Sequence, residues 1–173
     1  LWIGTSSGLY IYDRSDDHFL YFDKTTKYGV FISCEVKKIV KTKNGLIWIA
    51  TLGQGIFIYD PAKDVLTQNS IRTFFAWDIC QGTDSLVYVS SMQEGLLCFD
   101  EQGTFLQSYP VSFELNIGNQ RINCLHSIDH EIWCGVGTNS LGCYQEGSQE
   151  QTYRHRSLHH QIGGIVVNGQ PSQ

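Results

Sequence analysis

Residues 47–60 read IWIATLGQGIFIYD, two short runs of β-branched and aromatic residues joined by a glycine-containing turn. The same pattern returns as LWIGTSSGLYIYD at residues 1–13, VYVSSMQEGLLCFD at 87–100 and IWCGVGTNSLGCYQ at 132–145. An aromatic residue heads each copy, at positions 2, 48, 88 and 133, so the steps between copies are 46, 40 and 45 residues. A period of about 40–50 residues built of short strands is typical of a β-propeller with one blade per repeat.

Each copy divides into four short strands, and the second copy shows this division most clearly. Its strands are predicted to cover residues 34–40, 46–51, 56–59 and 65–68. Asn44-Gly45 joins the first two strands and is a strong hairpin signal, because both residues tolerate positive φ. Asp60-Pro61 ends the third strand, and Asp60 can accept hydrogen bonds from backbone amides two residues further on. No window has the 3.6-residue period of a helix, so we expect an all-β chain.

Two recurring residue types have structural explanations. The aromatic residue of the second strand is expected to fill the space between neighbouring blades. Glycine recurs at Gly8, Gly55 and Gly95, directly after the turn into the third strand. A tight hairpin at this point requires a residue without a Cβ atom.

The strand count predicts a β-propeller of four four-stranded blade repeats. The blade units cover approximately residues 1–32, 33–75, 76–120 and 121–161, and residues 162–173 supply the inner strand of a split or following blade. Two arrangements stay open: this last strand pairs with residues 1–5 and closes a small ring, or the chain is an open arc of a larger propeller. We expect the open arc, because most sequences of this repeat type form larger rings. Its uncovered blade faces and strand edges predict self-association.

The composition describes one ordered domain and argues against some partners. The chain has 173 residues, of which 42% are hydrophobic and 17% charged, and its formal net charge is −5. No basic stripe could track phosphates, so no nucleic-acid partner is expected. No apolar stretch of about 20 residues is present, so this segment itself is not expected to contact a membrane. The lysines of one short cluster are expected to face water along a strand edge: Lys37, Lys38, Lys41 and Lys43.

The cysteines are predicted to be core residues. They are Cys34, Cys80, Cys98, Cys124, Cys134 and Cys143, and no C-x-x-C pair occurs among them. Cys98, Cys134 and Cys143 occupy repeat positions where other copies carry isoleucine. Free cysteine commonly behaves as a small hydrophobic residue, so we expect no metal site and no cofactor. Disulfide pairing stays open.

The recurring pattern of Leu/Ile-Trp-Ile-Gly/Ala-Thr, followed by Gly-Leu/Ile-x-Ile-Tyr-Asp, closely resembles the two-component regulator propeller repeat. The resemblance covers essentially the whole chain and is closest in the first two copies. It implies the extracytoplasmic, periplasmic sensor region of a hybrid histidine kinase that detects polysaccharide breakdown products. The kinase would reside in other modules, so the resemblance implies a non-catalytic segment whose ligand is an oligosaccharide.

The family motif is structural, so binding residues must be inferred from propeller geometry. Ligand faces are usually lined by loops that lead into first strands and by the turns between second and third strands. Aromatic rings in such loops suit the apolar faces of sugars, while Arg, Asn and Gln can bind hydroxyl or uronate groups. The candidate ligand-binding residues are Arg72, Phe74, Phe75, Trp77, Gln93, Asn119 and Arg121. The competing interpretation is that the aromatic residues pack between blades and the arginines form surface ion pairs.

Two other function classes stay open. One is a propeller scaffold for protein interactions with no small ligand. The other is a calcium-assisted lactonase or lyase, in which Glu35, Asp78 and Asp129 near the inner strands would bind the cation. No Gly-x-Ser-x-Gly motif is present, and no catalytic residue is assigned.

Overall fold

The computed structural model describes residues 1–71, 73, 75–109, 121–137, 140–146, 154–157, 160–161 and 164–165. The first sheet contains β1 (Trp2–Thr5), β2 (Gly8–Asp13) and β3 (His18–Tyr21). The second contains β4 (Glu35–Lys41), β5 (Ile47–Leu52), β6 (Gly55–Asp60) and β7 (Val65–Gln68), and the third contains β8 (Ala76–Gln81), β9 (Val87–Ser91), β10 (Gly95–Phe99) and β11 (Phe105–Tyr109). The fourth contains β12 (Ile122–Ile128), β13 (Glu131–Val136), β14 (Ser140–Gln145) and β15 (Arg154–Ser157), and β16 (His160–Gln161) pairs with β17 (Gly164–Ile165).

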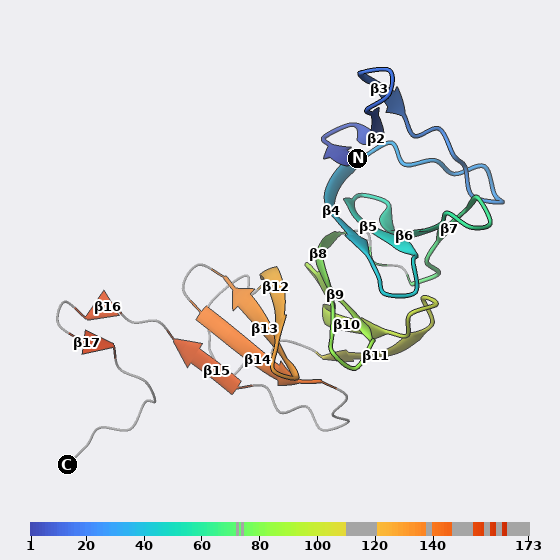
Figure 1. The fold of residues 1–173 in the computed structure, drawn as a ribbon. Coiled ribbons are helices and arrows are strands. Elements are labelled where there is room, and N and C mark those ends of the chain that lie inside the picture. Colours follow the sequence, from blue (N-terminus) through green and yellow to red (C-terminus); the bar gives the residue numbers. More distant parts are fainter. Residues whose placement is uncertain are drawn as a thin grey trace, which may run out of the picture.

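The first four sheets are antiparallel meanders that follow one another in a row (Figure 1). The first strand β4 packs beside β8, β8 packs beside β12, and β1 packs beside β4. The first and fourth sheets stand at opposite ends of the row. All regular structure in the described residues is β-strand, and none of them forms a helix that could cross a membrane. The predicted all-β fold of propeller-like blades is therefore confirmed.

Three hydrophobic clusters fill the three interfaces between consecutive sheets. Between the second and third sheets, Trp48 and Ile58 pack with Val89, Leu97 and Phe99. Trp48 is fully buried, and its ring centroid lies 5.6 Å from that of Phe99. The predicted role of the recurring tryptophan as filler between blades is confirmed at this interface.

Hairpins occur where they were predicted, although the turn at Asn44-Gly45 uses only one positive φ. Gly45 has φ +90°, and its N–H donates to the Thr42 carbonyl at 2.9 Å. Asn44 acts through its side chain instead, since its Oδ1 accepts from the Thr42 hydroxyl at 2.7 Å and from Leu46 N–H at 3.2 Å. A left-handed residue at the last turn position produces the three-residue form of hairpin rather than the two-residue form.

The aspartate at the end of the third strand in the first three repeats accepts the hydrogen bond that was predicted for Asp60. Asp13, Asp60 and Asp100 each accept a hydrogen bond from the backbone amide two residues further on, at 2.9–3.0 Å. These bonds satisfy amides of the turn that the ladder leaves unpaired.

The cysteines match their predicted role in part. Cys98, Cys134 and Cys143 are buried, and all six thiols are free. Burial raises the pKa of Cys98 to about 11 and that of Cys80 to about 12, so these thiols stay protonated at neutral pH. Cys124 is exposed, contrary to the expectation of a core residue. It lies on an inner strand, next to a bulge described below.

A buried carboxylate links the third and fourth sheets. Glu146 follows β14, and its side chain is 1% exposed. It accepts hydrogen bonds from the backbone N–H groups of Thr83 and Asp84, in the turn between β8 and β9, and from the Ser127 hydroxyl. Burial alone would raise the pKa of Glu146, but these hydrogen bonds outweigh burial and hold its pKa below the usual value.

Replacing Glu146 with glutamine is expected to reduce the free energy of unfolding by about 2 kcal/mol at neutral pH. Because the pKa of Glu146 is lower in the folded state, its ionised form stabilises the protein above the unfolded pKa. That advantage is lost as pH falls through the folded pKa. Urea unfolding of both proteins between pH 7 and pH 3 should show the difference shrinking in acid. A difference that grew in acid would contradict this, and Asp16→Asn, in an exposed turn, is the control.

Candidate functional site

The three inner strands β4, β8 and β12 carry a β-bulge at the same repeat position. The register shifts between Val36 and Lys38, between Ala76 and Asp78, and between Ile122 and Cys124. The extra residues are Lys37, Trp77 and Asn123. A bulge takes a residue out of the ladder and re-aims its side chain, and bulges are frequent next to functional sites.

Two bulge residues and one loop residue form a cluster around an indole ring. Lys37 Nζ lies 4.5 Å from the ring centroid of Trp77, and Arg121 Cζ lies 4.8 Å from it. Arg121 directly precedes β12, so these residues come from three consecutive sheets. Each cation–ring contact is worth about 0.5–1 kcal/mol. We call Lys37, Trp77 and Arg121 the inner-strand cluster.

The charges in the inner-strand cluster are unequally paired. Lys37 donates to Glu35 at 3.0 Å, and its side chain is 25% exposed. Arg121 is exposed, and no ion pair between described residues includes it. The Trp77 ring is half-buried. The cluster is thus a half-buried indole with an ammonium group and a guanidinium group over its ring.

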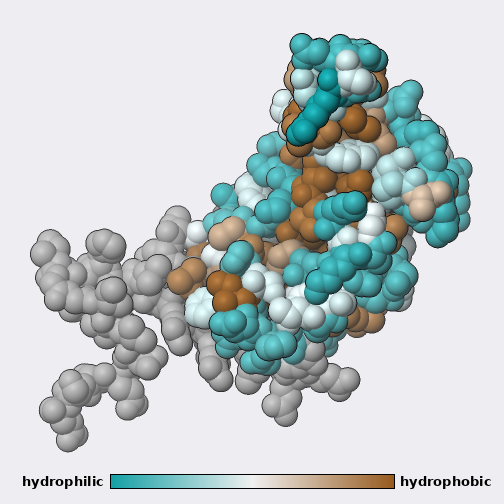
Figure 2. Space-filling model, viewed as in Figure 1, coloured by the Kyte–Doolittle hydropathy of each residue, from teal (hydrophilic) through white to brown (hydrophobic). Residues whose placement is uncertain are grey.

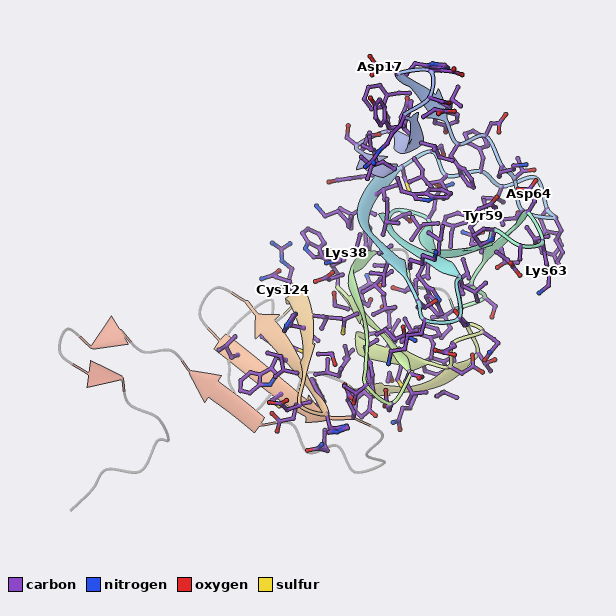
Figure 3. The ribbon with its side chains drawn as sticks, viewed as in Figure 1. Asp17, Lys38, Tyr59, Lys63, Asp64 and Cys124 are labelled. Carbon is purple, nitrogen blue, oxygen red and sulfur yellow. The ribbon has the colours of Figure 1, made fainter. Side chains whose placement is uncertain are left out.

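Asp78 follows Trp77 on β8 and contacts both neighbouring sheets. Its carboxylate accepts from Ile79 N–H and from Leu125 N–H, both at 2.8 Å, and lies 3.2 Å from Lys38 Nζ. The backbone N–H of Asp78 donates to the Ser90 hydroxyl at 2.9 Å. Figure 3 labels the equivalent positions of the two neighbouring strands, Lys38 on β4 and Cys124 on β12. One buried carboxylate therefore ties the second, third and fourth sheets together.

The proposed calcium site of the enzyme alternative does not fit this geometry. Asp78 is occupied by N–H donors and an ammonium group, and Glu35 is paired with Lys37. Asp129 lies in the turn after β12, at the far end of that strand from Arg121. Among the described residues, no three His, Cys, Asp or Glu side chains are placed to hold a metal ion.

The structure places the predicted ligand-binding residues in different surroundings. Trp77 and Arg121 are brought into contact with each other. Phe75 is 38% exposed and forms an isolated bridge with Leu52, and Gln93 is exposed in the turn between β9 and β10. Within the described part of the chain, the structure does not join either residue to the inner-strand cluster. Arg72, Phe74 and Asn119 lie outside the described residues.

Sequence reasoning missed Lys37 as a site residue. The lysine cluster was interpreted as a water-facing edge, whereas the Lys37 side chain is mostly covered and lies against Trp77. The signal that could have identified it is its repeat position, which is equivalent to that of Trp77.

The row of sheets is similar to parts of several solved structures. One is described as the extracellular domain of a hybrid two component system, BT3049, from B. thetaiotaomicron. Its TM-score is 0.60 at 22% identity, covering 78% of this chain and 17% of that chain. The corresponding domain of BT4673 from the same organism has a TM-score of 0.70 at 17% identity, covering 96% and 22%. The chain thus spans about a fifth of the length of these sensor structures.

An enzyme shares the same architecture. Virginiamycin B lyase from Staphylococcus aureus has a TM-score of 0.66 at 12% identity, covering 86% of this chain and 48% of that chain. Because sensor domains and a lyase both match at low identity, the likeness establishes the fold and not the activity. No family model matches the sequence, and no curated protein does.

Proposed function

We propose that this chain is a non-catalytic segment of the periplasmic sensor region of a hybrid two-component regulator, where it helps to bind an oligosaccharide. The observation that carries the proposal is the inner-strand cluster, a half-buried indole with two cations over its ring where three blades meet. The fold likeness to extracellular domains of hybrid two-component systems supports the cellular setting.

A ligand at this point could transmit a signal because it contacts more than one blade. Lys37, Trp77 and Arg121 belong to three sheets whose relative packing depends on apolar interfaces. A saccharide that binds one packing arrangement better than another shifts the population towards it. That shift would bias the cytoplasmic kinase of the parent protein.

The test is a thermal-shift panel of oligosaccharides on the wild-type chain and two variants. A ligand that binds only the folded state raises the melting temperature. We expect at least one saccharide to do so for the wild type and for Phe105→Leu, a control for an exposed aromatic residue on β11. Trp77→Leu should abolish the shift. If no saccharide shifts the wild type, or if Trp77→Leu responds normally, the binding proposal fails and the interaction-scaffold alternative gains support.

The first sheet offers a surface for a second function, association with another copy of the chain. Ile3, Tyr10, Tyr12 and Phe19 occupy the repeat positions of Ile49, Phe57, Tyr59 and Leu66 in the second sheet. In the second sheet, Ile49, Phe57 and Leu66 are buried in the interface with the first sheet. In the first sheet, Phe19 is 62% exposed, and Figure 2 shows hydrophobic surface over the first two sheets. An equivalent face is thus covered elsewhere in the molecule by a neighbouring sheet.

We expect the chain to self-associate through this face, and Phe19→Ser to shift the monomer–dimer equilibrium about tenfold or more towards monomer. Burying one large aromatic side chain contributes enough free energy for that change. Sedimentation equilibrium of both proteins measures it, with Tyr28→Ser as control because Tyr28 is 81% exposed in a loop. A wild-type chain that stays monomeric at high concentration, or equal weakening by both substitutions, would contradict this assignment.

A further inference from the structure

We infer that the inner-strand cluster selects an acidic saccharide, one that carries a uronate carboxylate, over its neutral counterpart. This inference rests on the proposed saccharide-binding function and specifies its ligand class. It depends on the positive charges around Trp77, because an aromatic ring alone would not distinguish an acidic sugar from a neutral one.

The cluster is locally positive on a chain whose net charge is −5. Three cations gather around the start of the inner strands: Lys37, Lys38 and Arg121. Glu35 pairs with Lys37, and Asp78 pairs with Lys38. Arg121 remains without a carboxylate among the described residues, so an incoming anion would balance the one uncompensated charge.

Arg121 has the geometry that carboxylate recognition requires. A guanidinium group offers parallel N–H donors that match the two oxygens of a carboxylate. Its contact with the Trp77 ring, at 4.8 Å, restricts the side chain before any ligand arrives. Because less side-chain entropy is then lost on binding, the ion pair forms at lower cost.

The ring and the guanidinium together match a sugar acid. A pyranose ring has an apolar face that can lie against an indole, while the carboxylate projects from the edge of the sugar ring. Trp77 would contact the first feature through the part of the indole that Lys37 and Arg121 leave uncovered, and Arg121 would contact the second. A neutral sugar could contact Trp77 but would form no ion pair with Arg121.

Isothermal titration with trigalacturonic acid and its methyl ester tests the inference, because the two ligands differ in charge and little else. We expect the acid to bind the wild-type chain at least about tenfold more tightly than the ester. The preference should shrink between 50 and 300 mM salt, since the ion pair is solvent-accessible. Arg121→Gln should bring the two affinities together by weakening binding of the acid much more than binding of the ester. Arg14→Gln, at an exposed arginine of the first sheet, is the matched control and should retain the preference.

The outcomes separate this inference from the proposed function. If the ester binds as tightly as the acid and Arg121→Gln changes neither, acid selection is overturned while saccharide binding stands. If a sulfated trisaccharide is preferred over trigalacturonic acid, the assignment to a carboxylate is wrong. If neither trigalacturonate ligand nor any neutral oligosaccharide binds, both proposals fall. Unchanged thermal unfolding of Arg121→Gln would show that the variant is folded.

Discussion

Replacing Gly55 with alanine is expected to destabilise the protein by about 3 kcal/mol, whereas the same change at Gly29 should cost about 1 kcal/mol. Both glycines have φ +77°, so the backbone cost of adding a Cβ atom is the same. At Gly55, that atom would lie 2.3 Å from the carbonyl oxygen of Thr73, while at Gly29 it would meet nothing within 4 Å. The difference between the two losses of stability therefore measures the free-energy cost of the steric clash with the Thr73 backbone.

Urea unfolding of the two variants beside the wild type provides the measurement. The contact cannot relax cheaply, because Thr73 is buried and its hydroxyl hydrogen-bonds Glu94 at 3.0 Å. Equal losses at the two positions would show that the segment before β8 yields to the new methyl group. Gly55 would then be required only for its φ angle.

Replacing Asp78 with alanine should cost about 3 kcal/mol, the second large effect. The change removes the acceptor for Leu125 N–H, a buried group of the next sheet, and leaves Lys38 without its partner. Asp78→Asn should cost less, because its amide oxygen can still accept one of the two backbone N–H groups. Lys38→Met should cost no more than about 1 kcal/mol, since that side chain is 44% exposed.

Thermal and urea unfolding should place the three variants in the order alanine, asparagine, then Lys38→Met, from most to least destabilised. If Lys38→Met proved as damaging as Asp78→Ala, the ion pair rather than the backbone hydrogen bonds would hold the three sheets together.

Much of the fold follows from local sequence signals. Strand positions in the second repeat were predicted within about one residue, because β-branched and aromatic runs bounded by glycine and aspartate are local features. The asparagine of Asn44-Gly45 was harder to interpret. Its side chain accepts hydrogen bonds from Thr42 and Leu46, and Asn44 itself does not adopt a positive φ. The Asn-Gly preference alone does not distinguish a turn with two positive φ angles from a turn held by the asparagine side chain.

The site was only partly predictable. Trp77 and Arg121 were chosen because they lie in loops and strand starts at one end of the blades, which repeat geometry identifies. Lys37 and Asp78 were assigned other roles, because their partners are about 40 residues or more away and belong to other sheets. The repeat position of Asp78 carries lysine in one blade and cysteine in another, so the pattern itself offers no guide.

The sequence by itself determined that this protein is a series of antiparallel four-stranded units, because strand period, turn residues and repeat spacing act over a few neighbouring residues. Only the tertiary structure decided that Lys37, Trp77 and Arg121 meet and that Asp78 bonds the next sheet. The physical reason is the packing of one sheet on another. Packing sets which bulged side chains from successive blades come within reach, and charge and hydrogen bonding then act between them.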